Sequence, residues 1–140
     1  MSNNIIAVSG GFDPVHVGHV RMIVEASKIG DVAVILNTDE WLLRKKGYVF
    51  MPWEERAEIL RSITGVKYVV MAQDVDGTVC ESLSSLKDVL KLTHFANGGD
   101  RVKDNTPEMI VCDSLGIEMI WNCGGEKIQS SSDLVKNSNV

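Results

Sequence analysis

The chain has 140 residues, 44% of them hydrophobic, which is enough to bury one core, so we expect a single domain over residues 1–140. A net charge of −5 and a pI near 5.1 argue against a nucleic-acid-binding surface. No segment has the length and hydrophobicity of a signal peptide or a membrane span, which predicts a cytoplasmic protein without membrane association. The three cysteines are scattered without a CxxC pair, which predicts buried thiols rather than disulfides or a zinc site.

Apolar segments of strand length alternate with segments of helical periodicity along the chain. The predicted strands are residues 5–8, 31–36, 66–71, 94–96 and 117–121, and the predicted helices begin near residues 18, 53, 79, 105 and 130. This alternation predicts an α/β fold, a Rossmann-like three-layer sandwich with a five-stranded parallel sheet. Ligands of such sheets bind beyond the carboxyl ends of the strands. The chemistry is therefore expected in the predicted loops 10–19, 37–47, 72–78, 97–104 and 122–131.

The first of these loops carries two histidines three residues apart, where an apolar strand turns into a helix. Gly10 and Gly11 let the backbone approach a ligand closely, and Pro14 prevents an early helix. The N–H groups at a helix start favour an anion, and the imidazoles of His16 and His19 add hydrogen-bond donors. The pattern predicts a phosphate site. Two other interpretations are metal ligands, although the spacing is not that of HExxH, and ordinary loop histidines.

Two motifs at opposite ends of the chain carry a family resemblance. The sequence from His16 to His19 follows Gly-Phe-Asp and resembles the HxGH signature of the nucleotidylyltransferase superfamily. That superfamily includes glycerol-3-phosphate cytidylyltransferase, heptose-phosphate adenylyltransferase and phosphopantetheine adenylyltransferase, and the first two are nearest in pattern. The serines at positions 130–132 resemble the family's SST motif, with Gln129 where isoleucine is usual. Serines also cap helices, and capping is compatible with phosphate binding.

The resemblance assigns roles to residues that are distributed along most of the chain. It implies the catalytic residues His16, His19 and Lys46. It implies a nucleotide site made of Gly10, Gly11, Phe12, Asp13, Gly18, Gly99, Asp100, Ser130, Ser131 and Ser132. It implies acceptor binding by Asp39, Lys45, Arg56, Arg101 and Lys127. Taken alone, the basic run 44–46 would be a solvated loop, and either Lys45 or Lys46 could be the phosphate-contacting lysine, with Lys46 favoured.

The implied reaction is nucleotidyl transfer without a covalent enzyme intermediate. A phosphate oxygen of a small phosphorylated sugar or polyol would attack the α-phosphorus of ATP or CTP, and pyrophosphate would leave. The histidines would donate to phosphate oxygens, and positioning and charge neutralisation would supply the catalysis. We expect Mg²⁺ as the cofactor, held mainly by the triphosphate and water, with no metal ligands from the protein. We also expect a homodimer.

A competing signal lies at residues 74–79, directly after the third predicted strand. The sequence Asp-Val-Asp-Gly-Thr-Val matches the DxDGT pattern of haloacid-dehalogenase-type phosphatases, in which Asp74 would be the nucleophile and Asp76 the acid and base. Such phosphatases carry this motif on their first strand, so its position here is unfavourable. A third hypothesis is a catalytically silent nucleotide-binding protein, which would bind nucleotide without turnover.

Overall fold

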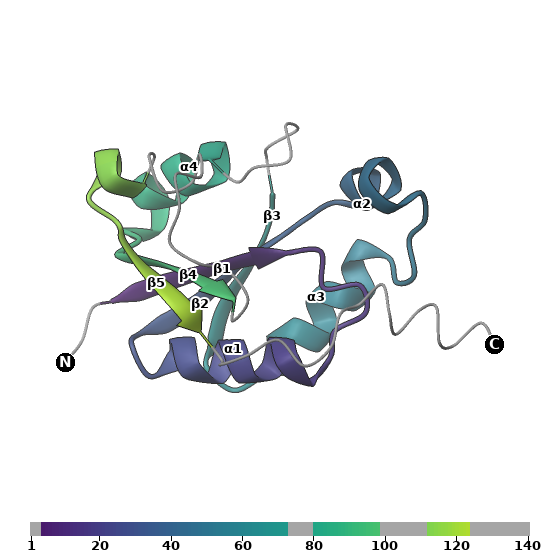
Figure 1. Cartoon of the computed structure of the whole chain (residues 1–140), viewed down its shortest axis with the longest axis horizontal. Helices are drawn as coiled ribbons and strands as arrows, with labels where there is room; N and C mark the ends of the chain where they lie inside the picture. Colours follow the sequence, from purple (N-terminus) through teal and green to yellow (C-terminus); the bar gives the residue numbers. More distant parts are fainter. Residues whose placement is uncertain (1–3, 73–79, 99–111, 124–140) are drawn as a thin grey trace.

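The computed structural model describes residues 4–72, 80–98 and 112–123 of the chain. In chain order its elements are β1 (Ile5–Gly10), α1 (Val17–Ser27), β2 (Asp31–Leu36), α2 (Asp39–Lys46), α3 (Trp53–Arg61), β3 (Val66–Met71), α4 (Cys80–Leu90), β4 (His94–Gly98) and β5 (Glu118–Cys123). The five strands form one sheet in the order β3-β2-β1-β4-β5, with parallel pairing throughout. The predicted α/β fold with a five-stranded parallel sheet is confirmed (Figure 1).

Both faces of the sheet are covered, which makes the fold three-layered. Successive residues of β1 point to opposite faces, so Ile6 and Val8 belong to one core cluster and Ala7 to the other. The first cluster packs against α1 and α3, and the second packs against α4 and the helical residues 112–115. Figure 1 shows α1 and α3 below the sheet and α4 above it. Because both faces are buried there, the inner strands β1 and β2 contain continuous apolar runs, as the sequence indicated.

Most predicted elements agree with the structure. The bounds of β2 and β3 are as predicted, whereas β1 and β4 each extend two residues further, and β5 covers residues 118–123 instead of 117–121. The prediction of a loop over residues 37–47 was wrong, because α2 occupies most of it. The starts of the helices predicted near residues 105 and 130 lie outside the described residues. Among the helices that are described, none is long and apolar enough to cross a bilayer.

The local sequence explains why α2 is a helix. The Oγ1 atom of Thr38 accepts the backbone N–H of Trp41 at 3.0 Å and caps the first turn, which also carries two acidic residues. The basic residues 44–46 lie in the last turn, where they interact favourably with the helix dipole. Gly47 ends the helix in a left-handed conformation with φ of 84°. The charge run is therefore the carboxyl end of a helix and not a loop.

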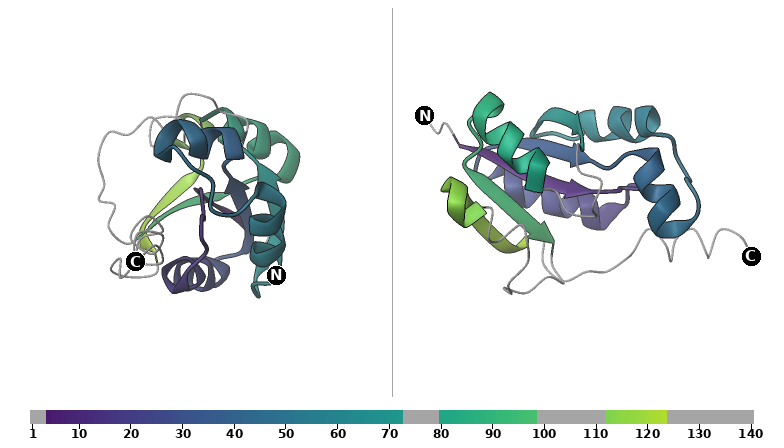
Figure 2. Two further views of the ribbon diagram at one scale, coloured as in Figure 1. Left: turned by 90° about the vertical axis from the view of Figure 1, so that its right-hand side faces the viewer. Right: turned by 90° about the horizontal axis from the view of Figure 1, so that it is seen from above.

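The strand order determines where a ligand can enter the fold. The chain leaves β1 toward β2 and β3 on one side, and later adds β4 and β5 on the other side. The topological switch point therefore lies at the carboxyl end of β1, between β1 and β4. The segment that follows β1 there is the loop at residues 10–19, for which the sequence predicted a phosphate site and which is called the phosphate loop below. Helix α2 lies beyond the same edge of the sheet (Figure 2).

Candidate active site

The loop between β1 and α1 is short and tightly held. Phe12 is buried and has φ of 49°, a left-handed conformation that costs a non-glycine residue on the order of 1 kcal/mol. Its ring packs edge-on against the imidazole of His19, with 4.6 Å between the ring centroids. A Cβ on Gly11 would lie 2.9 Å from Cδ2 of Leu42, so a side chain there would force Leu42 to shift. The surrounding packing thus imposes the loop conformation.

The two histidines form the amino-terminal cap of α1. His16 is the N-cap residue, and its Nδ1 accepts the backbone N–H of Gly18 at 3.1 Å. His19 is at position N3, and its Nδ1 accepts the backbone N–H of His16 at 3.1 Å. This reciprocal arrangement is a capping box in which imidazoles replace the usual hydroxyl and carboxylate. The two rings are stacked with 3.8 Å between their centroids, so both are fixed in orientation.

These hydrogen bonds assign the protonation of both rings. A ring nitrogen that accepts an N–H group cannot carry a proton itself, so Nδ1 is unprotonated in both His16 and His19. The proton of each neutral ring is therefore on Nε2. The two stacked rings therefore place two Nε2–H groups at the amino-terminal end of α1. A Cβ on Gly18 would lie 3.0 Å from Cε1 and 3.1 Å from Nδ1 of His16, so a side chain at this position would press on the His16 ring.

Asp13 connects this loop to the segment between α2 and α3. Its carboxylate is buried and accepts the backbone N–H groups of Phe50, at 2.7 Å, and Met51, at 2.6 Å. The amino group of Lys46 donates to the backbone oxygen of Asp13 at 3.4 Å. Burial lowers the pKa of Lys46, and the nearby Asp13 carboxylate opposes that shift. An anion bound beside Lys46 would favour its charged form.

Arg56 joins three of the loops at this edge of the sheet. Its side chain is fully buried and donates to the backbone oxygens of Gly11, Asn37 and Met51 at 2.7, 2.8 and 2.9 Å. Its Nη2 atom also forms an ion pair with Asp39 at 2.6 Å. Four of its five donors are thus occupied within the protein. The role of Arg56 and Asp39 in acceptor binding stays a prediction, and the geometry adds a positioning role for both.

Helix α2 contributes a second cation. The amino group of Lys45 lies over the ring of Trp41, 4.7 Å from its centroid, which is a cation–π contact. Lys46 lies 5.9 Å from the ring centroid of Tyr48. The carboxyl end of α2 therefore combines two lysines with aromatic rings beside the phosphate loop.

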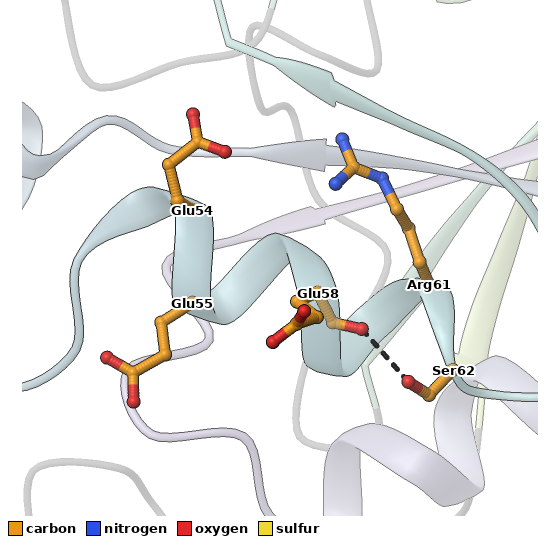
Figure 3. Close-up of a pocket in the computed structure, with 5 residues that line it drawn as sticks. All are labelled: Glu54, Glu55, Glu58, Arg61 and Ser62. Carbon is orange, nitrogen blue, oxygen red and sulfur yellow. Dashed lines mark hydrogen bonds between the residues drawn. The ribbon is translucent and has the colours of Figure 1, made fainter.

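A separate pocket lies on the outer face of α3, with a volume of about 660 Å³. It is lined by Glu54, Glu55, Glu58, Arg61 and Ser62 (Figure 3). The hydroxyl of Ser62 donates to the backbone oxygen of Glu58 at 3.0 Å. None of the predicted site residues lines this pocket, and its three carboxylates are unfavourable for a phosphate.

Comparisons with known proteins agree with this geometry. The sequence model described as cytidylyltransferase-like matches residues 7–138, which is nearly the whole chain. The chain belongs to the cytidylyltransferase-like family. The predicted resemblance to nucleotidylyltransferases is thereby confirmed. The match also includes residues 74–79, so the DxDGT-like segment is part of the cytidylyltransferase-like region, although it lies outside the described residues.

Proteins similar to this cytidylyltransferase-like chain include both HldE proteins and FAD synthases. It is 32% identical over 124 residues to the bifunctional protein HldE of Syntrophotalea carbinolica. The aligned region covers 86% of this chain and 22% of that protein. It is 38% identical over 90 residues to an FAD synthase of Pyrococcus abyssi. This alignment covers 62% of the present chain and 60% of the FAD synthase. The chain thus spans about a fifth of the length of the HldE proteins that it matches.

Two solved structures share the fold at low sequence identity. A lipopolysaccharide core biosynthesis protein from Thermoplasma volcanium superposes with a TM-score of 0.66 at 19% identity, over 85% of this chain and 95% of that chain. A putative nicotinate-nucleotide adenylyltransferase from Vibrio parahaemolyticus gives a TM-score of 0.65 at 13% identity, over 95% and 84% of the two chains. At these identities the likeness supports the Rossmann-like fold of the cytidylyltransferase-like family.

The structure brings together the predicted residues from the first half of the chain. At the carboxyl edges of β1 and β2 lie Gly10, Gly11, Phe12, Asp13, His16, Gly18, His19, Asp39, Lys45, Lys46 and Arg56. The remaining predicted residues lie outside the described part of the chain: Gly99, Asp100, Arg101, Lys127, Ser130, Ser131 and Ser132. Their roles stay predictions.

The sequence reasoning missed the aromatic residues next to the lysines. Trp41, Tyr48 and Phe50 flank the basic run, and this interleaving was visible in the sequence. It also missed the buried bonds of Asp13, whose partners are 37 and 38 residues away and cannot be identified from spacing. Within the described residues, no three His, Cys, Asp or Glu side chains are grouped to hold a metal ion.

Proposed function

We propose that this chain is a nucleotidylyltransferase that transfers AMP or CMP from ATP or CTP to a small phosphorylated acceptor. An acceptor phosphate oxygen forms a bond to the α-phosphorus, and the bond from that phosphorus to the oxygen bridging to the β-phosphorus breaks. Pyrophosphate leaves with the electron pair of that bond. The observation that carries the proposal is the histidine capping box at the switch point of a cytidylyltransferase-like sheet.

The site supports this chemistry through fixed donors. The Nε2–H groups of His16 and His19 are held by the cap before any ligand binds, so donating to phosphate oxygens requires little reorganisation. The amino-terminal end of α1 adds backbone N–H groups and a partial positive charge. Lys46 neutralises the charge that develops on the departing pyrophosphate, aided by Lys45. No side chain of the protein needs to form a covalent intermediate.

Mg²⁺ is the proposed cofactor, and it would neutralise and orient the triphosphate. We propose that phosphate and water hold the ion, because the two carboxylates described at the site already have partners within the protein. Both oxygens of Asp13 accept backbone N–H groups, and Oδ1 of Asp39 pairs with Arg56. Neither carboxylate is arranged with others as a binding cage, in agreement with the lack of a three-residue cluster in the described ranges.

The acceptor is proposed to be a phosphorylated alcohol. The small phosphorylated sugars and polyols fit this description, and the similarity to an FAD synthase adds a flavin acceptor, because FAD is FMN joined to AMP. Both kinds of acceptor present a phosphate monoester of an alcohol. The reacting group is therefore the same, and the compounds differ only in what the chain carries.

The test is a pyrophosphate-release screen that crosses ATP, CTP, GTP and UTP with phosphorylated acceptors. We expect release that needs both a nucleotide and an acceptor, and a nucleoside diphospho compound detected by mass spectrometry. His19→Ala should abolish most of this release while nucleotide binding persists. Nucleotide binding without turnover for every acceptor would instead favour a silent nucleotide-binding protein. Phosphate release that depends on Asp74 would favour the phosphatase.

A further inference from the structure

One residue of the phosphate loop, Asp13, contacts both ends of the segment that joins α2 to α3. At the start of this segment, the amino group of Lys46 donates to the backbone oxygen of Asp13 at 3.4 Å. At its end, the carboxylate oxygens of Asp13 accept the backbone N–H groups of Phe50, at 2.7 Å, and Met51, at 2.6 Å. Residues 46–51 therefore form a short arc whose two ends are held by the same residue.

The carboxylate holds the far end of this arc more than side-chain packing does. Phe50 is 49% exposed, so burial of its ring contributes little to keeping residue 50 in place. Asp13 is fully buried, and hydrogen bonds from N–H groups to a carboxylate are stronger than those between neutral groups. Met51 is held a second time, because its backbone oxygen accepts from Arg56 at 2.9 Å. Loss of the Asp13 charge would therefore loosen the chain that leads back to Lys46.

Asp13 also supplies a negative charge beside two cations. Burial lowers the pKa of Lys46, the charge of Asp13 opposes this shift, and the positive charge of Arg56 adds to it. Arg56 has an ion pair of its own with Asp39 at 2.6 Å. The ring of Tyr48 also lies near the amino group of Lys46, with its centroid 5.9 Å away. Among these groups, Asp13 provides the charge that favours the ammonium form of Lys46.

Asp13 lies three residues before His16, so it connects the histidine cap with the lysine at the end of α2. We propose that Asp13 is a positioning residue that acts through Lys46: its carboxylate fixes the segment that follows Lys46, and its charge balances the two cations beside it. In the proposed reaction, on which this last step rests, the ammonium group of Lys46 is thereby kept charged and in place for the departing pyrophosphate.

This role differs from the one that the family resemblance implied, which was a contact of Asp13 with the nucleotide. Both carboxylate oxygens are buried and hold backbone N–H groups, so they face the protein. A residue that touches the nucleotide would affect turnover whether or not Lys46 is present. A residue that acts through Lys46 would lose most of its effect when this lysine is removed. The two roles can therefore be separated by experiment.

The coupling between Asp13 and Lys46 can be measured without turnover. Asp13→Asn keeps the shape of the side chain and removes its charge. NMR titration of ¹³C-methylated lysines should show a lower pKa of Lys46 in this variant than in the wild-type protein, because burial and Arg56 then act unopposed. Calorimetry with magnesium pyrophosphate should show weaker binding to the variant, and the difference should grow as the pH rises. An unchanged titration of Lys46 would overturn the proposal.

Asp31→Asn is the matched control at the opposite edge of the sheet. The carboxylate of Asp31 accepts from Lys67 at 3.4 Å, and both side chains are more than half exposed. This variant should lower the pKa of Lys67, because it removes the hydrogen bond that raises it. It should leave the titration of Lys46 and the binding of pyrophosphate unchanged. Equal shifts of Lys46 in both variants would reveal a general effect of net charge, and the proposal would be wrong.

A double-mutant cycle with Lys46→Met tests the same coupling in turnover. Asp13→Asn should lower kcat about fivefold or more when Lys46 is present, and less than about twofold in the Lys46→Met protein. With Lys46 present, the fall of kcat at alkaline pH should move to lower pH in Asp13→Asn, since Lys46 loses its proton earlier. Equal losses of kcat in the two backgrounds would indicate a nucleotide contact or a purely structural role, and would contradict the proposal.

Two further measurements apply if Asp13→Asn does not fold. Asp13→Glu keeps the charge and moves it by one methylene, and its loss of kcat should likewise be larger with Lys46 than with Lys46→Met. In the wild-type protein, the amide hydrogens of Phe50 and Met51 should exchange about a hundredfold or more slowly than in an unfolded chain. Rapid exchange of both amides would show that the carboxylate does not hold the arc.

Failure of this proposal is distinguishable from failure of the proposed function. If Lys46 titration and pyrophosphate binding depend on Asp13 but no nucleotide and acceptor give turnover, the role of Asp13 stands and the proposed reaction is wrong. If turnover occurs and Asp13→Asn changes neither kcat nor its pH profile, the reaction stands and the positioning role is wrong.

Discussion

The two edges of the sheet both carry histidines, but they use them differently. At the amino-terminal edge, Nδ1 of His94 lies 2.7 Å from Oγ1 of Thr93, and its Nε2 lies 3.0 Å from a carboxylate oxygen of Glu118. Both ring nitrogens thus have partners from the protein. At the carboxyl edge, Nδ1 of His16 and Nδ1 of His19 each accept a backbone N–H group of the helix cap, which places the proton of the neutral ring on Nε2.

The polar groups at the amino-terminal edge serve the sheet. The hydroxyl of Thr93 accepts the backbone N–H of Ile5 at 2.9 Å and lies 3.1 Å from its backbone oxygen, so it closes the start of β1 against β4. At the other edge, Arg56 and Asp13 hold loops that carry cations and exposed rings. The comparison indicates that similar side chains stabilise the sheet at one edge and hold loops in place at the other, where we propose that the nucleotide binds.

Arg56→Ala should have the largest effect on stability. It removes four hydrogen bonds from a fully buried side chain and leaves three backbone oxygens without their donor. We expect a loss of about 3 kcal/mol or more in the free energy of unfolding, measured by urea denaturation. Most of it comes from the carbonyl oxygens, because Asp39 is 45% exposed and solvent screens its remaining charge. Arg61→Ala, an exposed control on the same helix, should change stability by less than about 0.5 kcal/mol.

Replacing one histidine at each edge by alanine would test whether only the carboxyl edge takes part in catalysis. His19→Ala should lower turnover about a hundredfold or more, because it removes a donor to the charge that develops during transfer. His94→Ala should leave turnover unchanged. His19→Gln should keep part of the activity, since its carboxamide oxygen can accept the His16 N–H and its amide group can donate.

The expected catalytic role of His19 depends on a tautomer with the proton on Nε2. This tautomer can be measured in the protein without ligand. Two-bond ¹⁵N–¹H correlation spectra should show a protonated Nε2 and an unprotonated Nδ1 for both His16 and His19 at neutral pH. A proton on Nδ1 of either ring would contradict the capping box. Equal turnover of the His19→Ala and wild-type proteins would remove the catalytic assignment.

Thr93→Val tests the amino-terminal edge with a smaller effect. Valine keeps the shape of threonine but leaves the backbone N–H of Ile5 without its acceptor. We expect a loss of about 1–2 kcal/mol in the free energy of unfolding, with unchanged turnover. A loss of turnover in the folded variant would show that the two edges are coupled, contrary to the comparison.

The smallest expected difference lies in the titration of two lysines. Burial lowers the pKa of Lys46 below 10.5, whereas the hydrogen bond that Lys67 donates to the Asp31 carboxylate raises the pKa of the exposed Lys67 above it. Lys67 therefore contributes stability at pH values below its ordinary pKa, and this is lost as the pH rises through its raised pKa. The charged form of Lys46 opposes folding until the pH rises through its lowered pKa. NMR titration of ¹³C-methylated lysines should show the two shifts in opposite directions, and pyrophosphate should raise the pKa of Lys46.

Much of the architecture follows from local sequence alone. The bounds of β2 and β3 were predicted to the residue, because both are strand-length runs of mainly hydrophobic side chains. The histidine cap was also predictable, since its partners are two and three residues apart. Helix α2 was missed although its signals are local: Thr38 as a cap, acidic residues in the first turn, and basic residues before Gly47.

Only the tertiary structure decided which residues that are distant in the chain become partners. Arg56 and Gly11 are 45 residues apart, and Asp13 and Phe50 are 37 apart, so no periodicity relates them. The family resemblance implied ligand contacts for Asp13 and Arg56, yet the structure shows both carboxylate oxygens of Asp13 and three of the four Arg56 hydrogen bonds engaged with backbone groups that the crossovers bring to the same edge. The sequence by itself determined the strands, the cap and the family's signature, since these depend on neighbouring residues. The packing of loops at the switch point decided which charges are buried and which aromatic ring remains exposed, because buried polar groups must find partners wherever the fold places them.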